Sequence, residues 1–217
     1  MDKVLITGCS KGIGRAAAIM FIQNGYTVHG IDIQEDTIHR KDYTHHICDV
    51  SDAASLPDIP EVQILINNAG VQDSGRDIEV NLLGTINCTE KYAIQPSILS
   101  IVNIASGSAH SGAEFPEYVA SKGGMLSYTK NTAKRVAAFG ATCNSISPGG
   151  VLTELNHPVM NDEDKWRRIM EQTPLRKWAE AEEIADWIYF LAVTNKSMTG
   201  QDVLIDNGEI INHNFVW

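Results

Sequence analysis

Tyr118 and Lys122 stand four residues apart in the run YVASK, within a stretch whose pattern predicts a helix. Residues four apart share one face of a helix. An ammonium beside a phenol favours the phenolate, so it can lower the hydroxyl's pKa from its reference value of about 10 toward neutral pH. We therefore expect Tyr118 to serve as a general acid or base. Taken alone, the pair is equally well explained as an amphipathic residue and a solvated partner one turn later.

A glycine-rich run, TGCSKGIG, lies near the N-terminus between a predicted strand and a predicted helix. Gly8, Gly12 and Gly14 are spaced more widely than in the common GxGxxG form. Backbone amides at a helix N-terminus can hold the pyrophosphate of a dinucleotide. The run by itself could be a tight turn, but its strand-to-helix context favours a cofactor loop. Together with Tyr118, it points to hydride transfer.

Asp32 indicates which dinucleotide the protein uses. It stands at the end of the second predicted strand, where a carboxylate can accept hydrogen bonds from the adenosine ribose and repel a 2′-phosphate. This position favours NAD. Lys11 and Arg15, close to the glycine run, pull weakly toward NADP, and we give Asp32 more weight because no Lys or Arg follows it directly.

Length and charge limit the class of protein. The 217 residues suit one α/β domain over 1–217, with a substrate loop at about 150–178. The formal net charge is −10 and no Lys/Arg stripe is present, so we expect no nucleic-acid partner. The apolar runs are shorter than a membrane span needs and no signal peptide precedes the first strand, so we expect a cytoplasmic protein without a membrane. Four scattered cysteines predict neither a disulfide framework nor a metal site.

Short β-branched runs alternate with longer helical patterns, which is typical of a parallel sheet with crossover helices. Near-continuous apolar strands indicate a sheet buried on both faces. We therefore predict a single Rossmann-type, doubly wound α/β domain with a mostly parallel seven-stranded sheet. The predicted strands are Lys3–Thr7, Thr27–Ile33, His45–Val50, Val62–Asn67, Ser100–Ala105, Ala141–Ser147 and Asp202–Asp206. The predicted helices are Gly12–Asn24, Asp77–Tyr92, Pro116–Phe139 and Ala181–Thr194, with a shorter one near Asp162–Gln172.

Two crossovers are short. The segments 34–44 and 51–61 are near the minimum of about a dozen residues for a parallel connection, so we expect turns in place of full helices. The charged stretch at 162–168 is interpreted first as a solvated helix face, and second as a mobile flap over the site.

The sequence resembles the classical short-chain dehydrogenase/reductases. TGCSKGIG (7–14) is similar to the family's cofactor loop, NNAG (67–70) to its sheet-stabilising motif and YVASK (118–122) to its catalytic signature. NLLG (81–84), VNIAS (102–106), SPGGVLT (147–153), PLRKWAEAEEIA (174–185) and TGQDVLIDNG (199–208) follow in the family's order. The resemblance therefore covers nearly the whole chain.

The resemblance implies a role for each matching position. Tyr118 would be the acid/base, Lys122 would lower its pKa and bind the nicotinamide ribose, Ser106 would hydrogen-bond the substrate oxygen, and Asn81 would hold a water behind Lys122. Alternatively, Asn81 caps or kinks a helix. The implied cofactor contacts, besides Tyr118 and Lys122, are Gly8, Ser10, Lys11, Gly12, Ile13, Gly14, Asp32, Ile33, Asp49, Val50, Asn68, Ala69, Gly70, Pro148, Gly149, Val151 and Thr153.

Some positions depart from the family's pattern. Ala105 stands where the family usually has a first serine, so Ser108 is the reserve candidate for the role of Ser106. His110 is left out of the catalytic set, since a lone loop histidine is more often a surface residue or a substrate contact. The stretch Val71–Val80 is much shorter than in the family, which affects the adenosine side.

These observations predict an NAD-dependent oxidoreductase that interconverts a secondary alcohol and a ketone. The alternatives are an NADP-dependent carbonyl reductase of the 3-oxoacyl type, or a dinucleotide-binding regulatory protein with little turnover. The family implies a homodimer or homotetramer, and the apolar C-terminal INHNFVW could pack on a neighbouring subunit or close the core. We expect the substrate walls after Thr153 to be apolar and to suit a hydrophobic or mid-sized carbonyl compound. The expected wall residues are Leu155, His157, Val159, Met160 and Trp166.

Overall fold

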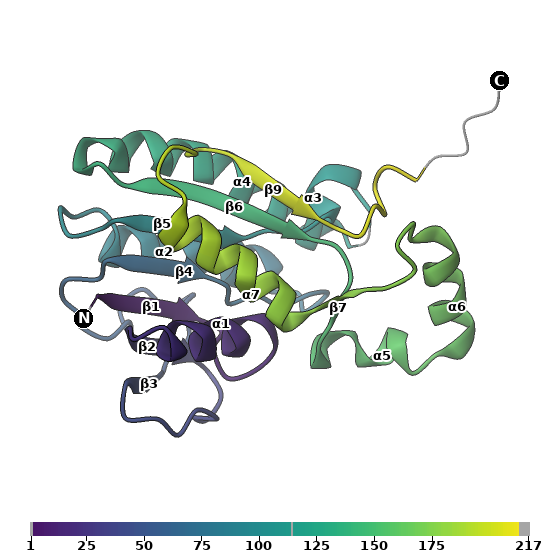
Figure 1. Ribbon diagram of the computed structural model, residues 1–217, viewed down its shortest axis with the longest axis horizontal. Helices are drawn as coiled ribbons and strands as arrows, with labels where there is room; N and C mark the ends of the chain where they lie inside the picture. Colours follow the sequence, from purple (N-terminus) through teal and green to yellow (C-terminus); the bar gives the residue numbers. More distant parts are fainter. Residues whose placement is uncertain (1, 114, 213–217) are drawn as a thin grey trace.

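A seven-stranded parallel sheet forms the centre of the computed structural model, which describes residues 2–113 and 115–212 (Figure 1). The strand order is β3-β2-β1-β4-β5-β6-β9. The strands are β1 Lys3–Thr7, β2 Thr27–Asp32, β3 Tyr43–Ile47, β4 Ile64–Asn67, β5 Ser100–Ile104, β6 Thr142–Pro148 and β9 Asp202–Ile205. All neighbouring pairs are parallel, so the predicted doubly wound α/β fold is confirmed.

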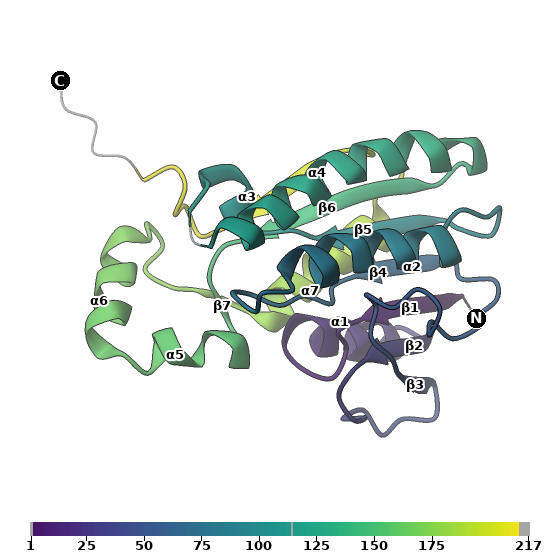
Figure 2. The same ribbon diagram turned by 180° about the vertical axis from the view of Figure 1, so that it is seen from behind.

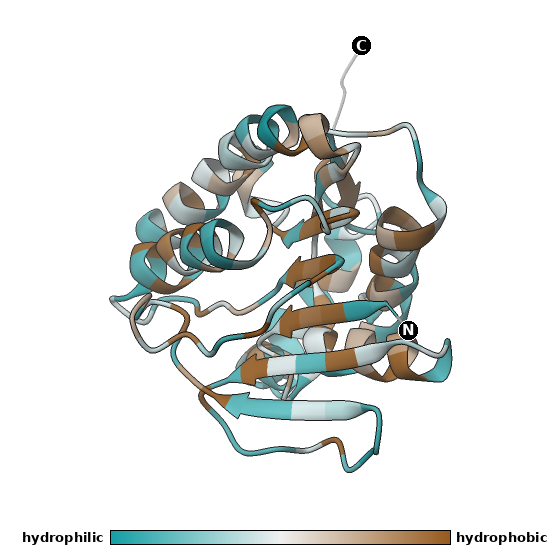
Figure 3. Cartoon of the chain, turned by 90° about the vertical axis from the view of Figure 1, so that its left-hand side faces the viewer, coloured by the Kyte–Doolittle hydropathy of each residue, from teal (hydrophilic) through white to brown (hydrophobic). Residues whose placement is uncertain are grey.

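Helices cover both faces of the sheet. α1 (Gly12–Gln23) and α7 (Ala181–Tyr189, continued by η4 Phe190–Thr194) pack against each other on one face (Figure 1). α2 (Gly84–Tyr92, preceded by η1 Ile78–Leu83) and α4 (Pro116–Val136, followed by η2 Ala137–Phe139) lie on the other (Figure 2). Each face has its own buried apolar cluster, the first around Phe21 and the second around Tyr92. Figure 3 shows the inner strands as mainly hydrophobic and the β3 edge as hydrophilic.

The two short crossovers contain turns and extended chain, with no helix over 34–42 or 51–61. β3 begins and ends earlier than the predicted His45–Val50. The earlier end is explained by Asp49, whose Oδ1 accepts hydrogen bonds from the Ser51 amide at 2.9 Å and the Ser51 hydroxyl at 2.7 Å. This local turn competes with strand pairing. Asp49 and Val50 therefore lie just past the strand, at its carboxyl end.

The carboxyl ends of the strands meet at one edge of the sheet, where the loops that follow β1, β4, β5 and β6 converge. Beyond this edge the chain forms a small separate unit (Figure 1). It contains a two-stranded sheet and three short helical segments. These elements are β7 Val151–Leu152, η3 Glu154–Asn156, α5 His157–Met160, α6 Glu163–Gln172 and β8 Ala179–Glu180, while α3 Ser108–Ser111 follows β5.

The C-terminal segment INHNFVW lies mostly outside the described residues, because only its first two positions fall within 2–212. Within the described part of the chain, no helix has the length and apolar character that crossing a membrane requires.

Candidate active site and cofactor cleft

A cavity of about 940 Å³ lies at the carboxyl ends of the strands. In open α/β sheets this is the edge at which ligands bind. Eighteen of the 21 predicted site residues line it. The three that do not are Ser10, Gly14 and Asn81. The structure thus gathers the two halves of the predicted site, the cofactor loop and the Tyr118 pair, in one cleft.

The glycine loop is packed too tightly for larger residues. Gly8 has φ +68°, and a Cβ on Gly14 would lie 2.1 Å from the Gly8 carbonyl oxygen. α1 starts at the next turn with no side-chain cap on its first amides. The Ser10 Oγ is buried and has no hydrogen-bond partner within the described structure. A loop with open helix amides and an unpaired buried hydroxyl fits a pyrophosphate group.

Asp32 joins the glycine loop to the end of β2. Its Oδ2 accepts a hydrogen bond from the Ser10 amide at 2.9 Å, and its Oδ1 accepts one from the Gln34 amide at 2.9 Å. The carboxylate lines the cavity and is followed by Ile33, which is 65% exposed. The negative charge is therefore held at the cleft wall by two backbone donors.

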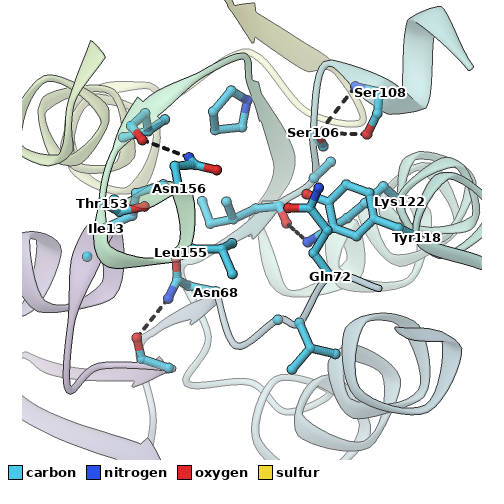
Figure 4. Close-up of a pocket in the computed structure, with 18 of the residues that line it drawn as sticks. Ile13, Asn68, Gln72, Ser106, Ser108, Tyr118, Lys122, Thr153, Leu155 and Asn156 are labelled. Atoms are coloured by element: carbon cyan, nitrogen blue, oxygen red, sulfur yellow. Dashed lines mark hydrogen bonds between the residues drawn. The ribbon is translucent and has the colours of Figure 1, made fainter. Parts of the chain in front are cut away.

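The NNAG motif fastens β4 to its neighbours. The Asn68 Nδ2 donates to the Thr7 and Gly8 carbonyls at 3.0 and 2.9 Å, one of which is visible in Figure 4. On the opposite side, the Asn67 Nδ2 donates to the Asn103 Oδ1 at 2.8 Å. These hydrogen bonds fix the carboxyl ends of the adjacent strands β1, β4 and β5 relative to one another below the cleft.

Tyr118 and Lys122 lie together on the first turns of α4, with side chains directed into the cleft (Figure 4). Lys122 is only 4% exposed, and its Nζ lies 5.7 Å from the centre of the Tyr118 ring. The Nζ donates to the Ile104 carbonyl at the end of β5, at 2.8 Å. Burial lowers the pKa of Lys122 to about 8, against the opposing charge of Asp77.

Ser106 follows β5 with one residue, Ala105, between them, and it lines the cleft on the same side as Tyr118 (Figure 4). The Ser108 hydroxyl, at the start of α3, makes a 2.8 Å hydrogen bond with the Ser106 Oγ, and the Ser108 amide lies 3.2 Å from the same atom. The candidate and its reserve are therefore hydrogen-bonded neighbours. The structure brings both to the site.

Asn81 lies behind the cleft, fully buried in the π-helical segment η1. Its Oδ1 accepts from the Val71 amide at 2.8 Å, and its Nδ2 donates to the Val71 carbonyl at 2.9 Å and the Ser121 Oγ at 3.0 Å. A Cβ on Gly70 would lie 3.3 Å from this Oδ1 and 3.5 Å from the Lys122 Nζ. Asn81 therefore ties the chain after NNAG to α4, next to Lys122. π-helical turns are frequent at functional sites.

An arginine that the sequence analysis did not select lines the adenosine end of the cleft. The Arg76 guanidinium donates to the Asp49 Oδ2 at 3.0 Å and the Ser51 Oγ at 2.8 Å. Burial raises the Asp49 pKa, but the hydrogen bonds from Ser51 and Arg76 outweigh this and hold that pKa below its ordinary range. Arg76 belongs to the shortened segment between NNAG and Asn81. The unusual length of this segment is the sequence feature that could have drawn attention to Arg76.

The opposite end of the cleft differs from the prediction. Of the expected wall residues only Leu155 lines the cavity. The prediction is wrong for His157, Val159, Met160 and Trp166, which lie on α5 and α6. Trp166 instead packs edge-on against Trp178, with ring centres 5.0 Å apart. The walls at this end include Ser111, Asn156, Gln172, Thr173, Trp178, Glu209 and Ile210.

His110 lies outside the cavity lining. Its Nε2 is 2.7 Å from the Asp202 Oδ2 and 3.3 Å from the Ser147 Oγ. It therefore connects α3 to β6 and β9.

Comparison with known proteins agrees with this architecture. The profile of a family described as "Enoyl-(Acyl carrier protein) reductase" matches residues 8–209. The chain is 29% identical over 240 residues to a 3-oxoacyl-[acyl-carrier-protein] reductase of Thermotoga maritima, covering 95% of this chain and 97% of the relative. It is 31% identical over 250 residues to an L-rhamnose 1-dehydrogenase (NAD(P)(+)) of a Sphingomonas species, covering 96% of each.

Solved structures give the same result. The chain superposes on the ligand-free aldohexose dehydrogenase of Thermoplasma acidophilum with a TM-score of 0.86 and 27% identity, covering 100% of this chain and 96% of the other. A putative 2-deoxy-d-gluconate 3-dehydrogenase of Agrobacterium tumefaciens, with bound NADP, gives a TM-score of 0.88 and 26% identity, covering 97% and 96%.

The sheet, the glycine loop and the Tyr118 pair in one cleft define an oxidoreductase of the Rossmann class. More narrowly, the chain belongs to the classical short-chain dehydrogenase/reductase family. This is a family of enzymes that use a nicotinamide dinucleotide, so the resemblance seen in the sequence motifs is confirmed.

Proposed function

We propose that the protein is an NAD-dependent oxidoreductase that interconverts a secondary alcohol and a ketone. The observation that carries this proposal is the convergence of Tyr118, Lys122 and Ser106 on one side of the cleft that also contains the glycine loop. In this proposal Tyr118 would be the acid/base, Lys122 the cation and Ser106 the hydroxyl donor near the carboxyl end of β5.

The cofactor is proposed to lie along the edge of the sheet. The backbone around Gly12 and the open N-terminus of α1 would bind its pyrophosphate, since oriented amides attract an anion. Asp32 would accept hydrogen bonds from the adenosine ribose, with Asp49 and Val50 at the adenine. Asn68, Ala69 and Gly70 would lie along the adenosine side. Pro148, Gly149, Val151 and Thr153 would bracket the nicotinamide. The bound dinucleotide supplies a hydride acceptor or donor.

The protein's own contribution is the handling of the proton. Tyr118 would exchange a proton with the substrate oxygen, and the Lys122 ammonium would favour the phenolate during this exchange. Ser106 would donate a hydrogen bond to that oxygen and stabilise the charge that develops on it, with Ser108 orienting the Ser106 hydroxyl. Asn81 would support Lys122 from behind, either by holding a water or by fixing the surrounding chain.

The acid/base role has a direct test. Purified protein with NAD and a panel of secondary alcohols is expected to produce NADH, followed by its absorbance. Tyr118→Phe removes one oxygen atom and is expected to abolish turnover while leaving NAD binding, measured by calorimetry, largely unchanged. A Tyr118→Phe variant with full activity would refute the mechanism.

The preference for NAD is supported by Asp32, held at the cleft wall with its charge toward the site, and by the uncharged Ile33 and Gln34 that follow it. A 2′-phosphate would meet this carboxylate. Asp32→Ala is expected to improve the kcat/KM ratio for NADP over NAD. If the parent protein already prefers NADP, the interpretation of Asp32 is wrong.

An NADP-dependent reductase of the 3-oxoacyl type is the second candidate, because the Thermotoga maritima relative carries that name over nearly the full length of both chains. Reduction of a 3-oxoacyl thioester with NADPH, faster than oxidation of any alcohol with NAD, would favour it. A regulatory role without turnover is the third candidate. The presence of Tyr118, Lys122, Ser106 and Asn81 argues against it, and binding of NAD without activity on any substrate class would support it.

A further inference from the structure

A partly buried carboxylate stands at the substrate end of the cleft, in a segment that no proposed catalytic role uses. Glu209 follows β9 and lines the cavity. Its Oε1 accepts hydrogen bonds from the Trp178 Nε1 at 2.9 Å and from the Thr173 hydroxyl at 3.3 Å. Burial raises the Glu209 pKa, while these two donors and the Gly150 amide oppose that rise. A charged group at such a position requires donors around it.

Glu209 is close to the residues that would carry out the reaction. A Cβ on Gly149 would lie 2.8 Å from the Glu209 Oε2. Gly149 is in turn next to the loop after β5, because a Cβ on Gly107 would lie 3.7 Å from the Gly149 Cα. Gly107 directly follows Ser106. The Oε2 atom is therefore next to Gly149, which in turn neighbours the loop that carries Ser106.

The carboxylate retains hydrogen-bonding capacity. An ionised carboxylate has about four acceptor positions, and the two donors from Trp178 and Thr173 both use Oε1. Among residues 2–113 and 115–212, the Gly150 amide is the one further donor that acts on this carboxylate. An apolar substrate would remove water from this atom and offer no donor in exchange, which is unfavourable for a charged group. A hydroxyl on the substrate would supply that donor.

The neighbouring walls are suited to the same kind of ligand. Ser111, Asn156 and Gln172 bring polar side chains to this end of the cleft, and the Trp178 ring offers an apolar surface. Figure 4 shows the Asn156 amide among the side chains directed into the pocket. Its Nδ2 already donates to the Val151 carbonyl at 2.8 Å, which fixes the orientation of the amide. A few polar groups placed beside an aromatic ring can fix the orientation of a ligand and select for its hydrogen-bonding groups. Hydroxyl groups on a substrate would meet this requirement.

We propose that Glu209 determines substrate specificity by accepting a hydrogen bond at Oε2 from a second hydroxyl of the substrate, which is therefore a polyhydroxylated, sugar-like alcohol. The proposal rests on the proposed oxidoreductase function, and it gives that function a substrate class. Two proteins similar to this chain are named as an L-rhamnose and an aldohexose dehydrogenase. A site built to bind a hydroxyl discriminates strongly against analogues that lack it.

The test compares two substrate classes with one variant. The kcat/KM of the parent protein with NAD is measured for a panel of aldohexoses and sugar alcohols, and for cyclohexanol and 2-butanol, which have no second hydroxyl. Glu209→Gln keeps an oxygen for Trp178 and Thr173 but replaces the acceptor near Gly149 with an amide NH₂. It is expected to lower kcat/KM for the best polyhydroxylated substrate about tenfold or more, mainly through KM. Activity on cyclohexanol is expected to change less than about threefold.

Thr173→Val is the matched control. It removes one donor from Oε1 and leaves Oε2 untouched, so the preference for polyhydroxylated substrates is expected to persist. Trp178 emission and the affinity for NAD report whether either variant has disturbed the cleft. The proposal is overturned if Glu209→Gln leaves the ratio between the two substrate classes unchanged, or if the parent protein prefers cyclohexanol or a 3-oxoacyl thioester. If only cyclohexanol is turned over, the proposed oxidoreductase function stands and the role of Glu209 is refuted. If no alcohol or carbonyl compound is turned over, both proposals are refuted.

Discussion

Replacing Lys122 with methionine separates the stability of this fold from its proposed chemistry. Lys122 is 4% exposed, and burial lowers its pKa from 10.5 to about 8. A fall of this size means that the folded state disfavours the ammonium by about 3 kcal/mol. Methionine has nearly the same length and no charge. We therefore expect Lys122→Met to lose alcohol oxidation and, at neutral pH, to gain resistance to unfolding.

The magnitude depends on pH in a defined direction. Between pH 8 and 10.5 the unfolded wild-type chain binds more protons than the folded one, so wild-type stability rises with pH through this window. The unfavourable term is fully present below pH 8 and absent above 10.5. Methionine also removes the 2.8 Å hydrogen bond from Nζ to the Ile104 carbonyl, a pH-independent loss of about 1 to 3 kcal/mol. The variant should thus be more stable by up to about 2 kcal/mol at pH 7, and less stable than wild type by pH 10.5.

The assay is urea unfolding of both proteins without cofactor at several pH values between 7 and 10.5. Other groups that titrate in this range are common to both proteins and cancel in the difference. Lys134→Met, which removes an exposed ammonium further along α4, is the control and should give a nearly constant difference from wild type. If the difference between Lys122→Met and wild type also stays constant from pH 7 to 10.5, Lys122 is not held in the folded state with a lowered pKa.

Two further substitutions test the cofactor cleft. Gly14→Ala is expected to weaken NAD binding at least about tenfold, because its Cβ would lie 2.1 Å from the Gly8 carbonyl oxygen. Gly123→Ala, in open space on α4, should leave NAD binding unchanged and stabilise the fold by about 0.5 to 1 kcal/mol; equal NAD affinity in the two variants would contradict the tight-loop argument. Arg76→Ala releases Asp49 and is expected to weaken ADP binding about two- to fivefold, since the ion pair is half exposed. Calorimetry with ADP and with nicotinamide mononucleotide checks this, and an equal loss for both ligands would rule out a role limited to the adenosine end.

Most of the sheet could be predicted from the sequence because buried parallel strands are continuous apolar runs. β1 begins and ends at the predicted residues, Lys3 and Thr7. β3 is polar and lies at the sheet edge, so its pattern was weak. The prediction for it extended to Val50, whereas the Asp49 side chain turns the chain after Ile47. A local side-chain hydrogen bond of this kind leaves the pattern of apolar residues unchanged, so that pattern does not reveal where the strand ends.

The cofactor side of the site was predictable because its residues follow strands directly, and strand ends converge at one edge of the sheet. The substrate walls were not. Apolar character suggested that Trp166 faces the substrate, but its ring packs against Trp178. Glu209 follows β9 after a short turn, yet its neighbours Trp178 and Thr173 come from a distant segment. Their hydrogen bonds to the carboxylate have no signature in the sequence.

The short crossovers and the shortened segment after NNAG are separate in the chain from the elements that carry Tyr118, Lys122 and Ser106. The segment after NNAG is rebuilt around Asp77, which is 1% exposed and accepts hydrogen bonds from the Asp73 and Ser74 amides. Arg76, the residue before Asp77, hydrogen-bonds to Asp49 at the cleft wall. Of the catalytic candidates, Asn81 is held by Val71 of this segment. The others depend on different elements, because Ser106 follows β5 and Lys122 stands on α4 and hydrogen-bonds to the end of β5. We therefore expect the shortening to affect the binding of the adenosine half of the cofactor, while β5 and α4 set the spacing between Tyr118, Lys122 and Ser106.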